Sequence, residues 1–337
     1  MSIVDNDLLR VLRGEHTERV PYWEVWFPRS GDLCRQILGH PAETVHDEVA
    51  LARRLGWQHI RIDGFDAGLP RTFRKVDGSQ ERYSPEVALH SLSQLDEVPP
   101  LDLAGISQDV VERVSAAHEN GLSAVAYLPW CYHAVSTSMG MLNFAIKTVD
   151  DVGFLHEALD FVEQRNRDAI LEVLIPAGVD AVLFDGDCAY RSGLTVSPHM
   201  FRELTQQRTS DTVAPLLRAG IPYLLHSDGK LDDVIPMLIE LDFSAVHGVE
   251  AVANDLADIK RRFGQDITLI GNMDINFLGY ASVEEIRHAT REMLATGAPG
   301  GRYVAACTSG PEGFIPLDNF LAYVEEVHAF VPEVATT

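Results

Sequence analysis

The sequence predicts a (β/α)8 barrel, also called a TIM barrel, and three observations support this fold class. Eight short apolar runs have the composition of strands, a segment long enough for a helix separates each from the next, and polar residues repeatedly follow the runs. Strands separated in this way pair in parallel, and eight of them close a ring. The competing fold, an open doubly wound sheet, lacks support because no glycine-rich dinucleotide fingerprint follows any strand. We therefore expect one domain over residues 1–337.

The predicted strands are mostly apolar runs that end in a proline, a glycine or a polar residue. In chain order they cover residues 19–27, 58–64, 123–128, 180–185, 222–226, 244–250, 267–271 and 302–307. The predicted helices carry apolar residues three and four positions apart and often stop at a glycine. They cover residues 5–13, 44–55, 106–120, 150–175, 199–219, 231–241, 255–263, 283–295 and 316–331, with a loop and short helix over 132–144.

One part of the chain, residues 69–100, does not fit a barrel unit. Apolar and polar residues alternate around residues 72–83, and the dipeptide Asp77-Gly78 lies in the middle of this alternation. Alternation interrupted by Asp-Gly is typical of a β-hairpin. The sequence therefore predicts a small hairpin inserted into the barrel.

The composition is that of a soluble globular protein, with 46% hydrophobic and 23% charged residues. The 27 lysines and arginines face 50 aspartates and glutamates, so the net charge is −23. Such a surface repels nucleic acid and anionic membranes. No apolar stretch is long enough for a membrane span, and the first residues do not form a signal segment, so we expect a cytoplasmic protein. The four cysteines are far apart and predict neither a disulfide framework nor a zinc ribbon.

Polar residues gather where the predicted strands end, which in a barrel is a single rim. The set comprises Glu24, Asp63, Asp185, Asp187, His226, Asp228, His247, Glu250, Asn272, Asp274, Cys307 and Ser309. Clustered carboxylates repel one another unless they share protons, pair with basic residues or surround a cation. Zinc accepts imidazole, thiolate and carboxylate together, so we expect a zinc or similar divalent site. Its candidate ligands are His226, Asp228, Glu250 and Cys307.

The remaining candidates are residues for proton transfer and for substrate binding. Aspartates at the rim are the expected proton-transfer groups: Asp63, Asp185, Asp187 and Asp228. Aromatic and polar residues near the same strand ends are the expected substrate-binding groups: Glu24, Trp26, Tyr127, Trp130, Tyr190 and Asn272. The alternative reading is structural, in which the aromatic residues pack in the core and the acids cap strands and helices.

Several segments resemble the uroporphyrinogen decarboxylase superfamily, which holds decarboxylases of haem synthesis and cobalamin- or corrinoid-dependent methyltransferases. The resemblance rests on six short segments: 184–187, 191–193, 197–198, 226–229, 271–274 and 316–319. It extends over nearly the whole chain and implies a (β/α)8 barrel, in agreement with the strand pattern.

Two departures from the family motifs help to decide whether the chain resembles the decarboxylases or the methyltransferases. The arginine-rich stretch that holds carboxylates in the decarboxylases is replaced here by Trp26-Phe27-Pro28-Arg29-Ser30-Gly31-Asp32. The methyltransferases carry a His-x-Cys and a later cysteine that hold zinc, and here His226 is kept, Asp228 replaces the first cysteine and Ser309 the second. The form of the His226 motif resembles less characterised members of the methyltransferase branch.

The resemblance implies a methyl-transferring enzyme. The expected reaction moves a methyl group from the oxygen or nitrogen of a small substrate to a corrinoid, supplied as free cobalamin or by a partner protein, with metal assistance. A decarboxylase and a non-catalytic binding barrel are the alternatives. The expected partners are the small methyl donor, a corrinoid protein and a second copy of the chain in a homodimer.

Overall fold

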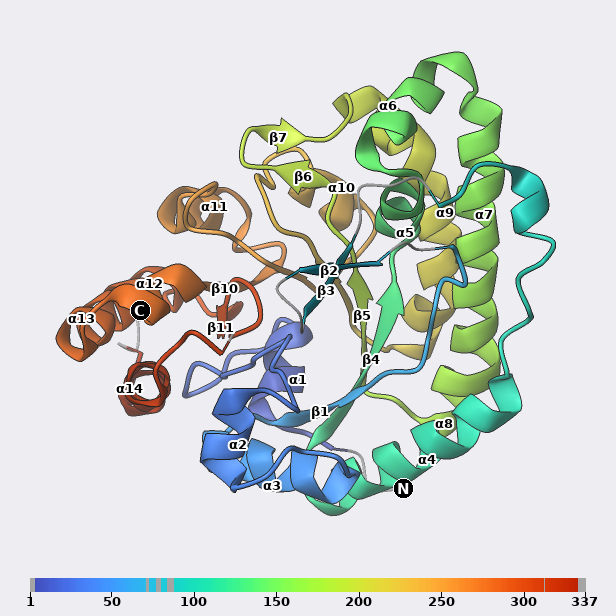
Figure 1. The fold of residues 1–337 in the computed structure, drawn as a ribbon. Coiled ribbons are helices and arrows are strands. Elements are labelled where there is room, and N and C mark those ends of the chain that lie inside the picture. Colours follow the sequence, from blue (N-terminus) through green and yellow to red (C-terminus); the bar gives the residue numbers. More distant parts are fainter. Residues whose placement is uncertain (1–3, 71–72, 77–79, 84–87, 312, 333–337) are drawn as a thin grey trace.

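A parallel sheet of seven strands curls into a barrel, and helices cover its outer face (Figure 1). The computed structural model describes residues 4–70, 73–76, 80–83, 88–311 and 313–332. Strand order in the sheet is β1-β4-β5-β8-β9-β10-β11, and all neighbouring pairs are parallel. Since this order follows the sequence, the predicted barrel fold class is confirmed. None of the described helices is long and apolar enough to cross a membrane.

The strands of the main sheet lie close to the predicted ranges: β1 (His59–Ile62), β4 (Ser123–Pro129), β5 (Ala181–Asp185), β8 (Tyr223–His226), β9 (Ala245–His247), β10 (Thr268–Met273) and β11 (Tyr303–Cys307). Helices precede, separate and follow them: α1 (Asp7–Leu12), α2 (Asp32–Leu38), α3 (Val45–Leu55), α4 (Leu103–Glu119), α5 (Cys131–Met139), α6 (Met141–Asp150), α7 (Val152–Ala169), α8 (Ile175–Ala177), α9 (Pro198–Ala219), α10 (Ile235–Glu240), α11 (Leu256–Phe263), α12 (Ile275–Tyr280), α13 (Val283–Gly297) and α14 (Leu317–Ala329). A 3-10 turn, η1 (Leu92–Gln94), and a π turn, η2 (Ile170–Leu174), complete the set.

Local sequence explains where several helices begin and end. A capping box formed by Thr44 and Asp47 starts α3, since each side chain accepts a hydrogen bond from the other residue's backbone amide. Gly220 ends α9 in the left-handed conformation, with φ of 68°. The predicted helix over 150–175 is continuous through α7, η2 and α8, whereas α2 and α12 were not predicted.

The first predicted strand, residues 19–27, forms only one bridge in the structure. Tyr22 pairs in parallel with Ala305 of β11. The Ala305 amide donates to the Pro21 carbonyl at 2.9 Å, and the Trp23 amide donates to the Ala305 carbonyl at 3.0 Å. The prediction of a full strand here was wrong, although these residues fill the eighth position of the ring.

A glutamate side chain explains why this pairing stops. The Cys307 amide, the next on β11 that could bond the first segment, donates to the Glu24 carboxylate at 3.3 Å rather than to a backbone carbonyl. On its other side the segment meets β1 through side chains, because the rings of Trp23 and His59 lie 5.0 Å apart. The barrel is therefore closed partly by side chains.

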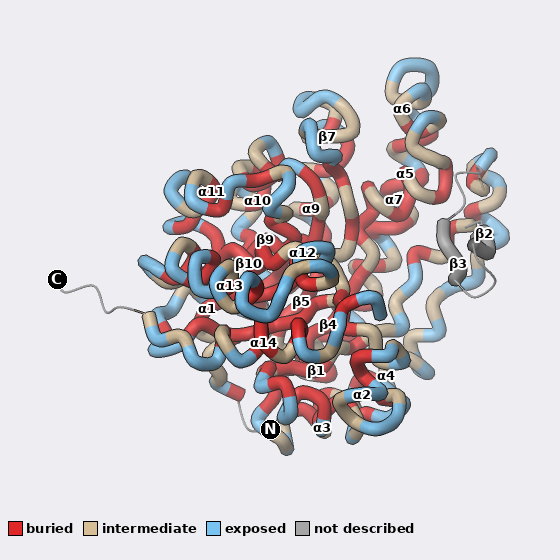
Figure 2. Tube along the Cα trace, turned by 60° about the vertical axis from the view of Figure 1, so that its left-hand side comes forward, coloured by how far each residue is buried: buried red, intermediate tan, exposed pale blue. Residues whose placement is uncertain are grey.

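Alternation along the strands produces two core layers. Inside the barrel, α1 packs against the inward side chains at the start of the strands; this inner cluster includes Leu8, Leu9, Leu12, Trp23, Val125, Leu183, Leu224, Ile270 and Val304. The larger cluster lies between the sheet and the outer helices. Figure 2 shows buried residues running through the centre, with exposed residues on the outer turns.

Two small hairpins interrupt the barrel pattern. The predicted insertion contains β2 (Phe73–Val76) and β3 (Gln80–Tyr83), which pair antiparallel, while its Asp77-Gly78 turn lies outside the described residues. A second hairpin, β6 (Ala189–Tyr190) and β7 (Gly193–Leu194), follows β5 and was not predicted. Because it follows the C-terminal end of β5, the second hairpin helps to form the mouth of the barrel.

Candidate metal centre and arginine network

Five strands each place an inward side chain at or near the mouth of the barrel. These residues are Arg61 of β1, Tyr127 of β4, Asp185 of β5, His226 of β8 and His247 of β9. Side chains alternate along a strand, so a residue two positions after an inward-facing one also faces inward, as His226 does after Leu224. Asp185, His226 and His247 are direct partners in the sheet register. The structure thus gathers these residues in one layer, as expected for a barrel enzyme.

Three side chains at this mouth form a group that could hold a metal ion. One ligand atom each from Asp187, His226 and Asp228 lies within 4.8 Å of the others. No other group of three such ligands is found among the described residues. Nε2 of His226 lies 3.8 Å from Oδ1 of Asp187, which accepts a hydrogen bond from the Asp228 amide at 2.9 Å. We call these three residues the triad. It contains the predicted ligands His226 and Asp228.

Hydrogen bonds fix which nitrogen of His226 carries the proton. Nε2 of His247 lies 3.0 Å from the carbonyl oxygen of Cys307, which can only accept, so this nitrogen is the donor. A neutral His247 then has a bare Nδ1, and Nδ1 of His226 lies 2.7 Å from it. His226 must donate to His247 through Nδ1, which leaves Nε2 of His226 unprotonated on the side of Asp187. Histidines that bind metals are typically held in this way, with the second ring nitrogen donating to a neighbouring acceptor.

Burial supports the neutral state of both imidazoles. It lowers the pKa of His226 to about 3, with a further contribution from the neighbouring His133. Burial also lowers the pKa of His247 well below its usual value, and His226 adds to this. Both rings are therefore neutral at physiological pH, and a neutral imidazole is the form that binds a metal.

One carboxylate oxygen of Asp228, near this imidazole, lacks a hydrogen-bond partner among the described residues. This oxygen, Oδ1, is buried. Burial, together with the neighbouring carboxylates of Asp187, Glu250 and Asp185, raises the pKa of Asp228 to about 8. A divalent cation would satisfy the orphaned oxygen and offset the repulsion between the acids, so an unprotonated nitrogen and two carboxylates fit such an ion.

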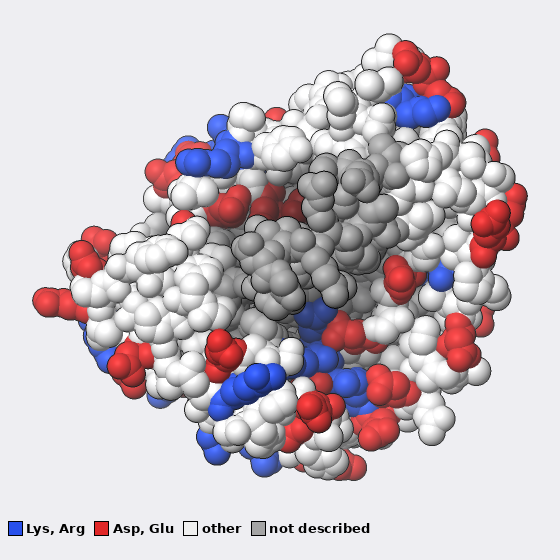
Figure 3. Space-filling view, in the orientation of Figure 1, with Lys and Arg blue, Asp and Glu red and all other residues white. Residues whose placement is uncertain are grey.

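The two aspartates of the triad line a cavity of about 320 Å³. Its walls include Asp187 and Asp228, the hairpin residue Tyr190, and Glu250. Gly229 lets the hairpin approach, because its φ is +89° and a Cβ there would lie 2.5 Å from the Ala189 carbonyl oxygen. Figure 3 shows acidic side chains inside a hollow on this face of the molecule.

Replacing His247 by Phe should weaken Zn²⁺ binding about 10- to 100-fold, because His226 loses the acceptor that fixes its tautomer. His247→Gln, which keeps an acceptor and a donor, should retain more of the affinity. The measurements are competition with a chromophoric chelator and the ¹⁵N imidazole spectrum of the metal-free protein. His199→Gln, at an exposed position, is the matched control. Unchanged affinity and an unchanged His226 tautomer in His247→Phe would contradict this role.

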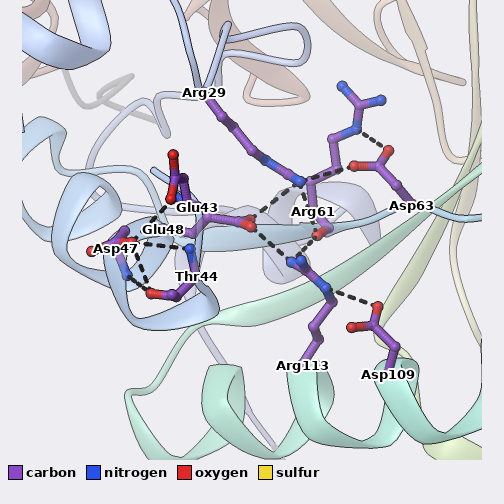
Figure 4. A network of polar contacts seen from close by, with 9 residues as sticks. All are labelled: Arg29, Glu43, Thr44, Asp47, Glu48, Arg61, Asp63, Asp109 and Arg113. Atoms are coloured by element: carbon purple, nitrogen blue, oxygen red, sulfur yellow. Dashed lines mark hydrogen bonds and ion pairs between the residues drawn. The ribbon is translucent and has the colours of Figure 1, made fainter. Parts of the chain in front are cut away.

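A network of three arginines and three acids lies on the other side of the mouth (Figure 4). Arg29 contacts Glu48 at 3.1 Å and Asp63 at 3.0 Å. Arg113 contacts Glu48 at 2.7 Å and, like Arg29, donates to the carbonyl of Arg61, at the edge of β1. Arg113 also contacts the third acid of the network, a surface aspartate of α4. These side chains occupy the edge of β1 that a full first strand would have covered.

Asp63 is bound on both sides within this network. Its Oδ1 accepts from Nε of Arg61, and its Oδ2 lies 3.0 Å from Nη1 of Arg29. Both carboxylate oxygens of Asp63 are thus engaged by guanidinium groups. The contact with Nε holds the Arg61 guanidinium group in one orientation, and the predicted role of Asp63 in proton transfer stays a prediction.

Glu24 and Cys307 are buried against each other, and neither belongs to the triad. Glu24 is 3% exposed, and burial raises its pKa to about 8 against the opposing hydrogen bonds from Cys307. The same burial, with Glu24 as neighbour, raises the pKa of the Cys307 thiol well above its usual value. Metals bind the thiolate form of cysteine, and here the thiol stays protonated and contacts Glu24. Cys307, predicted as a ligand, is therefore outside the triad, and Glu24, predicted to bind substrate, is buried.

The other predicted residues are divided among several places. Trp130 is 1% exposed and packs against Phe201 of α9, so it belongs to the core. Asn272 lines a separate cavity of about 580 Å³ beside α11 and α13. Tyr190 lines the triad cavity, and so does Glu250, whose carboxylate accepts from the Gly229 amide at 2.7 Å. Glu250 thus lies next to the triad without belonging to it.

Two aromatic residues connect the triad to the arginine network. The Trp26 ring lies 5.5 Å from the ring of His226 and 5.2 Å from that of Tyr127. The guanidinium carbon of Arg61 lies 4.5 Å from the Trp26 centroid and 4.4 Å from the Tyr127 centroid. Two of the four aromatic residues predicted to bind substrate, Trp26 and Tyr127, therefore lie at the mouth.

Sequence reasoning did not assign a role to His133, whose Nδ1 accepts from the Asp187 amide at 3.1 Å. It lies on α5, four residues beyond the end of β4. A histidine so close to the end of a barrel strand could have been predicted to lie at the mouth. His247 was placed at the rim but was given no role, because only the structure shows its contact with His226.

Comparisons with known proteins place these features in a family. The family model described as Uroporphyrinogen decarboxylase (URO-D) matches residues 81–330. Uroporphyrinogen decarboxylase of Alkalilimnicola ehrlichii is 24% identical, over 98% of this chain and 96% of that protein. The protein of the same name from Thioalkalivibrio sulfidiphilus is 29% identical over 53% of this chain, and the match spans about half of that protein's length (50%).

Among solved structures, a methyltransferase from Methanosarcina mazei has the same fold, with a TM-score of 0.71. It is 20% identical, and the superposition covers 96% of this chain and 97% of that one. The family model matches well over half of the chain, and the structural match covers nearly all of it. The chain belongs to the uroporphyrinogen decarboxylase (URO-D) family.

Proposed function

We propose that this protein is a corrinoid-dependent methyltransferase that takes a methyl group from the oxygen or nitrogen of a small substrate. The observation that carries the proposal is the triad, in which His226 presents an unprotonated Nε2 beside two carboxylates. The resemblance of the His226 motif to the methyltransferase branch supports it, as does the fold shared with the Methanosarcina methyltransferase. The methyl acceptor would be free cobalamin or a corrinoid protein.

The residues of the mouth have distinct tasks in this proposal. His226, Asp187 and Asp228 would hold a divalent cation, zinc or a similar ion. When bound, such an ion acts as a Lewis acid and makes an alkoxide or amine a better leaving group. His247 fixes the orientation of His226, and Trp26 with Tyr127 forms a wall against which a small substrate packs.

Proton transfer to the leaving group is assigned to Asp185. Of the predicted proton-transfer residues, Asp187 and Asp228 belong to the triad, and Asp63 is held by two arginines. Asp185 is the register partner of His226 and lines a cavity of about 170 Å³ beside Trp26. It is therefore next to His226 in the sheet and also borders a space in which a small substrate fits.

The test is incubation of the protein with chemically reduced cobalamin and a panel of methoxylated and N-methylated compounds. At least one compound should give the absorption spectrum of methylcobalamin, and His226→Ala should give none with the same compound. Tyr280→Ala, an exposed residue on α12, is the control and should behave as the wild type. No methylcobalamin with any member of a broad panel would contradict the proposal.

Decarboxylation is the second candidate, and the names of the curated relatives favour it. This reaction needs a pocket that removes water from a carboxylate and a group that stabilises the developing carbanion. The arginine network supplies cations near the mouth. Release of carbon dioxide from uroporphyrinogen, independent of cobalamin and of His226, would favour this candidate over methyl transfer.

A further inference from the structure

We propose that Arg61 binds a carboxylate group of a small molecule at the mouth of the barrel. The two terminal nitrogens of its guanidinium group have no hydrogen-bond partner among the described residues, whereas Nε is held by Asp63. Figure 4 shows the same arrangement, with the outer end of Arg61 carrying no contact to the residues drawn. The side chain is 28% exposed, so these donors are only partly open to water.

The guanidinium group is fixed before any ligand arrives. Asp63 sets its Nε edge, and Arg29, itself paired with the buried Glu48, holds Asp63 from the other side. The rings of Trp26 and Tyr127 contact the guanidinium carbon at 4.5 and 4.4 Å. A group held this way loses little conformational freedom on binding, which favours affinity.

The space in front of Arg61 suits a small flat anion. Arg61 lines the cavity of about 170 Å³, whose other walls include Phe65, Tyr127 and Leu128. Two parallel N–H donors match the two coplanar oxygens of a carboxylate.

The acids of the same cavity select a carboxylate over a phosphate. Asp63, Asp66 and Asp185 line it, and each has an interaction partner of its own. Their charge opposes a dianion more strongly than a single negative charge. The net charge of −23 further disfavours highly charged anions.

The anion site lies close to the triad. The guanidinium carbon of Arg61 is 4.5 Å from the Trp26 centroid and the His226 ring is 5.5 Å from it, so the two are at most about 10 Å apart. One small molecule could contact both. Carboxylate binding at Arg61 is independent of methyl transfer, whereas the further assignment that the methyl donor carries this carboxylate rests on the proposed function.

The experiment is an NMR titration of the whole protein with benzoate, methyl benzoate and inorganic phosphate, without cobalamin or turnover. Benzoate should bind the wild type at least about tenfold more tightly than its uncharged ester and than phosphate, since hydrogen bonds to charged groups contribute this much. Arg61→Met should bind benzoate as weakly as the ester, and Arg61→Lys, which keeps the charge but not the two parallel donors, should fall between. Arg291→Met, on the outer surface of α13, is the control and should match the wild type.

Equal binding of benzoate and its ester to the wild type would overturn the proposal, and this comparison needs no variant. Tighter binding of phosphate, or benzoate binding that Arg61→Met leaves unchanged, would overturn it as well. Failure of methyl transfer in the cobalamin assay would leave the result of this titration intact. If the titration succeeds, carboxylate-bearing members of the methyl donor panel should react with the wild type. Arg61→Lys should raise the KM for these compounds and leave kcat unchanged.

Discussion

Protein incubated with Zn²⁺ and then desalted should retain about one equivalent of zinc, and His226→Ala, Asp228→Ala and Asp187→Asn should each retain almost none. Each change removes one of the three donor groups that the structure brings within 4.8 Å. At a free zinc concentration one hundred times the Kd, the wild type should gain about 2.7 kcal/mol in unfolding free energy, and the variants should gain nothing. Elemental analysis and thermal unfolding measure the two effects.

Two further variants distinguish the triad from the ligand set expected from the sequence. Glu250→Gln preserves the acceptor for the Gly229 amide and should keep the zinc. Cys307→Ser replaces a buried thiol that contacts Glu24 and should keep it too. Loss of zinc in either variant would restore that residue to the ligand set. A wild type free of metal yet fully active in methyl transfer would contradict the metal site and leave the chemistry to the aspartates.

Glu24→Gln should make the protein more stable at pH 9 and leave its stability unchanged near pH 4. Burial raises the pKa of Glu24 from 4.5 to about 8, so the folded protein binds more protons than the unfolded chain between these values. Its contribution to stability is therefore complete below pH 4.5 and falls as the pH rises through 8. The difference should be on the order of 5 kcal/mol at pH 9.

The measurement is urea unfolding of the wild type and the variant at several pH values between 4 and 9. Other buried acids, such as Glu163, contribute to the same slope, so the difference between the two proteins isolates Glu24. Glu112→Gln, at an exposed position on α4, is the control and should leave the slope unchanged. Parallel stability curves for wild type and Glu24→Gln would show that Glu24 ionises freely in the folded protein.

Much of the fold could be predicted because its elements carry local signals. Buried parallel strands such as β5 and β8 are continuous apolar runs, and glycines such as Gly220 mark helix ends. The extent of the first strand was overestimated, because the contact that ends its pairing leaves no trace in the local sequence. Its pairing is stopped by the contact of Glu24 with an amide 283 positions later in the chain.

The candidate site was predicted in outline, and its details depended on geometry. Barrel topology placed His226 and Asp228 at the mouth, since strand ends must meet there. The participation of Asp187 depends on the loop between β5 and the second hairpin, which brings it against the Asp228 amide. Cys307 was expected to face the mouth, but it belongs to the outer layer because alternation on β11 sends Ala306 inward instead.

The position of α1 inside the barrel has a consequence for how the chain folds. Asn6, just before α1, bonds to Gln58 and Ser123, and the carbonyl of Val11 accepts a bond from Thr268. This helix therefore finds its last partners only when β11, which begins at Tyr303, has been synthesised, and its leucines stay exposed until then. Contacts this distant in sequence slow folding and lengthen the life of intermediates that aggregate. Chaperone dependence during synthesis should accordingly be strongest for chains arrested before β11 is complete.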